Sequence, residues 1–261
     1  MREFSKLVAL AGGIAFAAGL AYAADQTILG KSLTVKDPSG GSDASKRSIK
    51  GSAKEKDSGD TLVGNPTLAG TAGGAFLDIF ANGTHPTQQR FTLPQGTSST
   101  GKTFWTAAGS PVIAYKYKDV KGDQGPVKSL IIKRTASGGF SIKAKLAGKN
   151  GTIDVAPPAS GTDGCMAVKL GTGATATGDR YSVKFGPESK LKNIDAKVFA
   201  AKKPQNEGVC PTVTPTSTTT TTTVASTTTT TSTSTSTTTS TTLPYGSPSR
   251  AFLEKVESLL D

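Results

Sequence analysis

The segment GTSSTGKT at residues 96–103 has the G-x-x-x-x-G-K-T spacing of a phosphate-binding loop. A working loop of this kind needs a buried strand before it and a helix after it, so that backbone amides meet the phosphates. Here the preceding run is short and ends at Pro94, while Gly109 and Pro111 interrupt the segment that should be helical. The sequence therefore predicts a flexible polar loop and no nucleotide cofactor.

Few side chains suit catalysis or metal binding. His85 is the single histidine, and no G-x-S-x-G motif of a serine hydrolase occurs. The carboxylates that could pair for glycoside hydrolysis are scattered along the chain at Asp78, Asp119, Asp123, Asp154 and Asp163. Two cysteines and one histidine do not complete a zinc site without carboxylates. We therefore expect no catalytic residues, no metal ligands and no cofactor, and a protein that is not an enzyme.

The two cysteines, Cys165 and Cys210, are expected to form a disulfide, because paired cysteines are usual in exported proteins. Export is predicted by the N-terminus. A basic start leads to an apolar run from Leu7 to Leu20 and then to the small-residue segment ending at Ala23. The run is shorter than the roughly 20 residues of a membrane-spanning helix. We expect a signal peptide at residues 1–23, no transmembrane span after cleavage, and a secreted or cell-surface location.

Composition divides the rest of the chain into three parts. Residues 24–211 have the mixed composition of one globular domain, and residues 212–243 are almost wholly Thr and Ser. Such a tract cannot bury a core, so a disordered linker or stalk is expected. Residues 244–261 place an apolar stripe on a short amphipathic helix. This helix is expected to dock on a protein or membrane surface, or to begin a further domain.

Alternation of apolar and polar residues with a period of two dominates the predicted domain. Ile142, Ala144 and Leu146 alternate with lysines, for example. The runs cover residues 29–35, 48–54, 75–80, 90–93, 113–118, 127–133, 142–146, 165–170, 181–185 and 196–200. Clusters rich in Gly, Pro and Asn lie between them and are typical of turns. The pattern predicts an all-β fold, an antiparallel β-sandwich or barrel-like domain of about ten short strands.

If the apolar positions face inward, many lysines must face solvent. These are Lys36, Lys50, Lys54, Lys116, Lys118, Lys143, Lys145 and Lys184. The chain has 30 Lys and Arg against 19 Asp and Glu, a formal net charge of +11 at pH 7. Such a charge attracts polyanions, and we take Lys116, Lys118, Lys143, Lys145 and Lys184 as candidate polyanion-binding residues. Outward lysines also protect sheet edges and keep a surface soluble, which is the alternative interpretation.

The densest aromatic cluster contains Phe104, Trp105, Tyr115 and Tyr117. If they are exposed, Trp105, Tyr115 and Tyr117 are candidates for stacking against sugar rings; if they are buried, they belong to the core. The segments at residues 115–119 (YKYKD) and 125–129 (GPVKS) resemble those of uncharacterised exported β-rich proteins of environmental bacteria. That resemblance covers most of the predicted domain and implies no activity.

Three functions remain open from the sequence. The first is a secreted or surface-displayed non-catalytic domain that binds or adheres to anionic polysaccharide or a cell-surface glycan, with no specific nucleic-acid partner. The second is a carbohydrate-binding accessory module of a secreted degradative enzyme, in which the Thr-rich tract is an interdomain linker. The third is a hydrolase of unfamiliar type.

Overall fold

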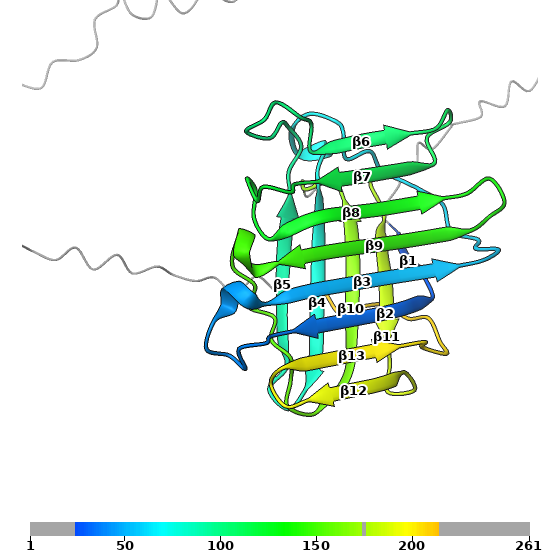
Figure 1. Cartoon of the computed structure of the whole chain (residues 1–261). Coiled ribbons are helices and arrows are strands. Elements are labelled where there is room, and N and C mark those ends of the chain that lie inside the picture. The colour runs from blue at the N-terminus through cyan, green and yellow to red at the C-terminus, as the bar shows by residue number, and fades with distance from the viewer. Residues whose placement is uncertain (1–23, 174–175, 214–261) are drawn as a thin grey trace, which may run out of the picture. The chain divides into compact units, whose positions relative to one another are not determined.

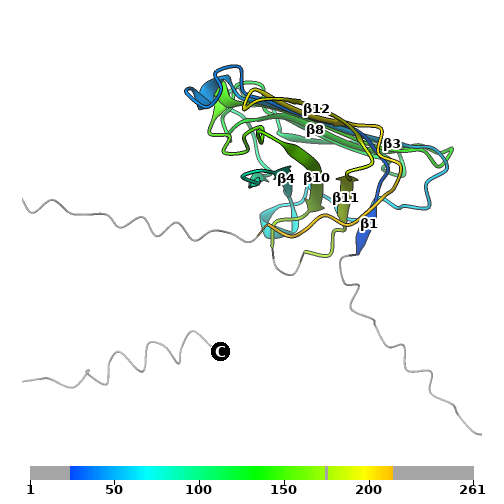
Figure 2. The ribbon, with the colours of Figure 1, turned by 90° about the horizontal axis from the view of Figure 1, so that it is seen from below.

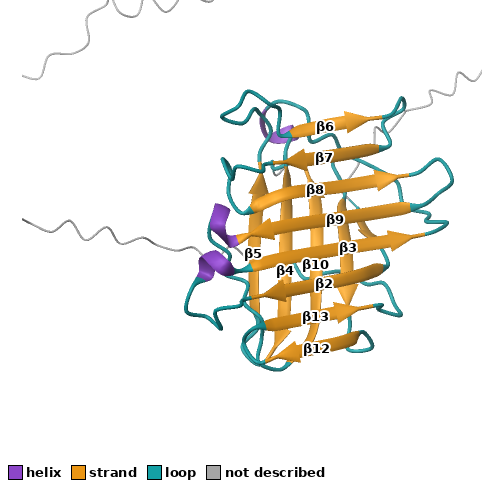
Figure 3. Cartoon of the chain, viewed as in Figure 1, coloured by secondary structure: helices purple, strands orange, loops and turns teal. Residues whose placement is uncertain are grey.

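The computed structural model describes residues 24–173 and 176–213, which form an all-β unit with two sheets (Figures 1 and 3). The only helical segments among these residues are single 3-10 turns at Ala44–Lys46, Gly70–Ala72 and Gly148–Asn150. The all-β prediction is thus confirmed. The predicted signal peptide, the linker from residue 214 onward and the predicted C-terminal helix lie outside the described residues.

One sheet has eight strands in the order β12-β13-β2-β3-β9-β8-β7-β6, and every neighbouring pair is antiparallel. In chain order its strands are β2 (Gly30–Lys36), β3 (Ser48–Glu55), β6 (Trp105–Ala108), β7 (Ala114–Lys118), β8 (Val127–Arg134), β9 (Phe140–Ala147), β12 (Lys190–Ile194) and β13 (Val198–Lys202).

The other sheet has five strands in the order β1-β11-β10-β4-β5. Its strands are β1 (Asp25–Thr27), β4 (Ala75–Gly83), β5 (Thr87–Leu93), β10 (Gly161–Leu170) and β11 (Arg180–Phe185). The short β1 runs parallel to β11, whereas the remaining neighbours are antiparallel, so this sheet is mixed.

The two sheets share one apolar core. In Figure 1 the strands of the eight-stranded sheet run across those of the five-stranded sheet, which lies behind it. Alternate residues of most strands point into the space between them, including Leu33, Ile49 and Ile142 from one sheet and Leu77 and Val168 from the other. All of these are fully buried. This burial removes apolar surface from water and is the main source of stability for such a fold.

Gly51 marks a close approach of the two sheets at the centre of β3. A Cβ atom at this position would lie 2.4 Å from the Sδ atom of Met166, which points inward from β10. Ordinary contacts begin at about 3.4 Å. The absence of a side chain at Gly51 therefore lets Met166 fill the middle of the core, in agreement with the dense packing of protein interiors.

Residues 203–213, which we call the strap, follow β13 and cross the outer side of the five-stranded sheet (Figure 2). The disulfide between Cys165 and Cys210 fastens the strap to β10, which confirms the predicted pairing. Arg180 of β11 donates hydrogen bonds of 2.8 Å and 2.6 Å to the carbonyl oxygens of Cys210 and Pro211. Val213 packs in a second apolar cluster with Phe80. The strap therefore covers the outer face of this sheet.

Candidate polyanion-binding surface

The outer face of the eight-stranded sheet is covered with lysines, and we call it the lysine face. It faces the viewer in Figure 1. Its lysines are all exposed, and those outside β12 alternate with inward-facing residues: Lys36, Lys50, Lys54, Lys116, Lys118, Lys133, Lys143, Lys145 and Lys202, with Lys190 and Lys192 on the fully exposed β12. Most of the other outward side chains are Ser, Thr or Ala. No Asp or Glu points outward from these eight strands.

Strand register arranges the lysines in rows across the sheet. In one row Lys118 is followed by Ser129, Lys145 and Lys50 on successive strands. Two residues further along the strands, Lys116 is followed by Ile131, Lys143 and Ser52. Neighbouring strands lie about 4.8 Å apart, so Lys118 and Lys145 are separated by roughly 10 Å. The rows form a regular grid of positive charge.

None of these lysines is paired with a carboxylate in the part of the chain that the structure describes. The salt bridges there are Lys46–Asp43, Arg47–Asp37, Arg90–Asp78 and Arg180–Asp25, and all of them lie outside the lysine face. Lys50 even lies directly opposite Lys145, a like-charged cross-strand pair that costs stability. The ammonium groups of the face are therefore available to an external anion.

Lys184 does not belong to this surface, unlike the other four candidates. It lies on β11 and points outward from the five-stranded sheet, on the other side of the molecule. Its methylene chain packs close to Gly208 of the strap, where an added Cβ would lie 2.8 Å from Cδ. The remaining candidates, Lys116, Lys118, Lys143 and Lys145, are brought together on β7 and β9.

The aromatic candidates are in the core. Trp105, Tyr115 and Tyr117 are 4%, 5% and 1% exposed, which leaves no ring face for a sugar to stack on. The Trp105 indole donates a hydrogen bond of 3.2 Å to the carbonyl oxygen of Leu93, and Tyr117 stacks on Phe104 with ring centroids 5.8 Å apart. Burial raises the pKa of the Tyr117 hydroxyl, and the negative charges of Asp119 and Asp123 add to this effect. These rings support the sheet beneath the lysines.

The loop at residues 96–103 folds back on itself. Its backbone amides are used internally: Gly101 donates to Ser98, Ser98 donates to Lys102, and Phe104 donates to Gly96. Strand β6 follows the loop in place of the helix that a nucleotide site requires. The loop therefore lacks the strand–loop–helix context of a phosphate-binding loop.

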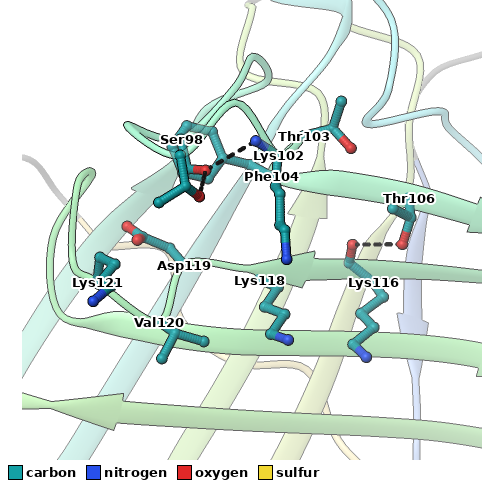
Figure 4. Close-up of a pocket in the computed structure, with 11 residues that line it drawn as sticks. Ser98, Lys102, Thr103, Phe104, Thr106, Lys116, Lys118, Asp119, Val120 and Lys121 are labelled. Carbon is teal, nitrogen blue, oxygen red and sulfur yellow. Dashed lines mark hydrogen bonds between the residues drawn. The ribbon is translucent and has the colours of Figure 1, made fainter.

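The same loop forms one wall of a pocket at the β6–β7 end of the lysine face (Figure 4). The pocket has a volume of about 540 Å³. Its lining includes Lys102 from the loop, Lys116 and Lys118 from β7, and Lys121 from the turn that follows β7. Phe104 also contributes to the lining. Sequence reasoning did not select Lys102 or Lys121, since both lie in turns outside any alternating run.

Two aspartates hold the walls of this pocket in place. The carboxylate of Asp119 is 2% exposed and accepts hydrogen bonds from the backbone N–H groups of Gly122, Asp123 and Gln124 at 2.8 to 3.0 Å. The carboxylate of Asp123 accepts a 2.7 Å hydrogen bond from the backbone N–H of Ser99. The second contact joins the 96–103 loop to the turn after β7, so the pocket is preformed.

The other carboxylates considered for catalysis do not converge. Asp78 forms a salt bridge with Arg90, with 2.7 Å between Oδ1 and Nε. Asp163 accepts a hydrogen bond from Asn82, and Asp154 is exposed. Within residues 24–173 and 176–213, no helix is long and apolar enough to cross a membrane.

The candidate surface is thus an extended cationic sheet face with a cationic pocket at one end. Comparison of the chain with protein-family models, curated proteins and solved structures found no match.

Proposed function

We propose that the chain is an exported, non-catalytic domain that binds anionic polysaccharide through the lysine face. The single observation that carries this proposal is the set of unpaired lysines spread over one outer sheet face, from whose eight strands no carboxylate points outward. A repeating polyanion that lies along such a face can neutralise several ammonium groups at once and release the counterions around them.

Protection of sheet edges does not account for the charge. The densest part of the face is on β3 and β9, which are neighbours in the interior of the eight-stranded sheet. The facing pair Lys50 and Lys145 destabilises the fold, and the alternation of a strand leaves both positions free to hold Ser or Thr at lower cost. Solubility alone would be served equally well by acidic side chains mixed among the lysines. A ligand of opposite charge explains both the sign and the position.

We further propose that the two sheets form a sandwich that keeps the lysine face flat, and that the chain acts outside the cytoplasm. The disulfide between Cys165 and Cys210 supports that location, because such bonds persist in oxidising compartments. The predicted signal peptide and Thr-rich stalk would export the domain and display it.

Retention on immobilised heparin, a model sulfated polysaccharide, tests the proposal with the full chain. The triple variant Lys50→Gln/Lys143→Gln/Lys145→Gln removes charge from the centre of the face. We expect it to elute at lower salt, and the slope of log K against log salt concentration should become shallower, because fewer counterions are released on binding. The matched control Lys56→Gln/Lys149→Gln/Lys197→Gln removes the same net charge from exposed turn positions outside the face.

The control variant should elute close to the unmodified protein. Equal shifts of the two triple variants would show that only net charge matters, and the proposed surface would then be wrong. Absence of retention for the unmodified chain at low salt would overturn the function itself.

A further inference from the structure

The pocket at the β6–β7 end of the lysine face differs from the rest of that face because it is concave. Its volume of about 540 Å³ falls within the 300–1,000 Å³ range of small-molecule sites. A single inorganic anion would leave most of this space empty. One or two sugar rings fit the size better.

The charge of the lining favours an anion. Lys102, Lys116, Lys118 and Lys121 supply four ammonium groups, against one carboxylate from Asp119. The Asp119 carboxylate is buried and accepts hydrogen bonds from three backbone N–H groups, so its oxygens face the backbone and the lysines outnumber it four to one. Figure 4 shows Lys102 extending from its loop towards β7, which carries Lys116 and Lys118. Lysines from separate segments therefore surround one space.

The remaining lining matches the other chemistry of a sugar. Hydroxyl groups of Ser98, Thr100, Thr103 and Thr106 can exchange hydrogen bonds with ring hydroxyls. Phe104 contributes to the lining, although at 2% exposure its ring leaves no face free for stacking. Specific ligand sites commonly combine a few placed polar groups with apolar lining in this way.

We infer that this pocket binds one or two sulfated or carboxylated sugar units of a polysaccharide chain that continues across the lysine face. This inference rests on the proposed function and adds a discrete subsite to it. The grid of lysines supplies sequence-independent attraction, and the pocket selects a unit by the position of its anionic groups. Its preformed walls, joined by the contact between Ser99 and Asp123, reduce the ordering cost of binding.

Calorimetric titration of the full chain with a trisulfated disaccharide prepared from heparin tests the subsite. A disaccharide is too short to reach from the pocket to Lys202 on β13, which lies five strands from β7, about 24 Å away at the usual strand spacing. We expect Lys102→Gln and Lys121→Gln each to weaken its binding about fivefold to tenfold. The matched control Lys202→Gln removes an equal charge from this distant part of the face and should change disaccharide affinity by less than twofold.

Two further ligands separate a sugar site from simpler alternatives. The desulfated disaccharide should bind at least tenfold more weakly, since it lacks the anionic groups. Inorganic sulfate should also bind at least tenfold more weakly than the trisulfated disaccharide. Equal affinity for sulfate and for the disaccharide would show an anion site that does not recognise sugar, and would overturn the inference.

The heparin column keeps the two proposals apart. The full chain could be retained on heparin while the disaccharide does not bind, or binds equally well to the Lys102→Gln protein. In that case the inference about the pocket is wrong, but the proposed function of the lysine face is unaffected. If the chain is not retained on heparin at all, the proposed function fails.

Discussion

Substitution of Gly51 by Ala probes the packing of the two sheets directly. The new methyl group would lie 2.4 Å from the Met166 Sδ atom, so the thioether must move by about 1 Å to reach an ordinary contact. Overpacking of a core typically costs about 1–3 kcal/mol. Removal of a glycine from a strand interior returns roughly 0.5–1 kcal/mol of backbone entropy. We therefore expect a net loss of about 1–2 kcal/mol in the free energy of unfolding.

Chemical denaturation monitored by the fluorescence of Trp105 provides the assay, and thermal denaturation should show a decrease in Tm of about 2–8 °C. Gly59→Ala is the matched control, because a Cβ at Gly59 would meet nothing within 4 Å and its φ is not in the left-handed region. This control should change stability by less than about 0.5 kcal/mol or increase it slightly.

A double-mutant cycle with Met166→Ala then isolates the contact between the sheets. Met166→Ala alone should cost about 2–5 kcal/mol, because it leaves a cavity. In the double variant the methyl group introduced at position 51 occupies part of that cavity, so the total loss should be smaller than the sum by at least about 1 kcal/mol. Additive losses would show that Gly51 and Met166 do not meet across the core, and the reasoning about the sheet packing would be refuted.

Three other outcomes follow from the structure. Cys165→Ser/Cys210→Ser removes a disulfide that joins residues 45 positions apart, so the free energy of unfolding should fall by about 4 kcal/mol. Limited proteolysis should then cut first in the strap, and unchanged protease resistance would contradict this prediction. Glu55 at the end of β3 has its pKa raised to about 7 by burial and by the nearby carboxylates of Glu207 and Asp60. Between about pH 4.5 and pH 7 the Glu55 carboxyl is therefore protonated in the folded protein but ionised in the unfolded chain. Its contribution to the free energy of unfolding falls as the pH rises through this range. Denaturation midpoints at pH 5 and pH 8 should differ less for Glu55→Gln than for the unmodified protein. An unchanged difference would show that Glu55 is not the cause of this pH dependence. Trp105→Ala should cost about 3–5 kcal/mol but leave heparin retention of the folded protein intact, whereas lost retention at unchanged stability would indicate a ligand contact.

Alternation in the sequence predicted most strands that have one apolar face in the core. All ten alternating runs overlap observed strands, because burial of one face imposes the period of two. The three strands that were not predicted are β1, β6 and β12. Each lies at the edge of a sheet, and β12 is exposed along its whole length. These edge strands are held by backbone hydrogen bonds to a single neighbour. Such bonds do not depend on the side chains, so they impose no alternating pattern on the sequence.

The composition of the candidate surface was only partly predictable. Alternation indicates that a lysine faces outward, but it does not indicate from which sheet, because the order of strands depends on pairing between distant segments. Lys184 alternates on β11 in the same way as Lys143 on β9, yet the two lie on opposite sides of the molecule. The pocket could not be predicted for the same reason. Lys102 and Lys121 are far apart in the sequence, and only the folded chain brings them to one pocket.

The position of Val213 has a practical consequence for measuring these interactions. This residue is seated on the outer side of the five-stranded sheet, on the side of the domain remote from the cationic grid. A biosensor chip that captures the domain through a tag placed directly after Val213 would consequently present the lysines to the flowing solution. Capture through surface amines would instead consume the groups under test, and the two immobilisation chemistries should report different polysaccharide affinities for the same molecule.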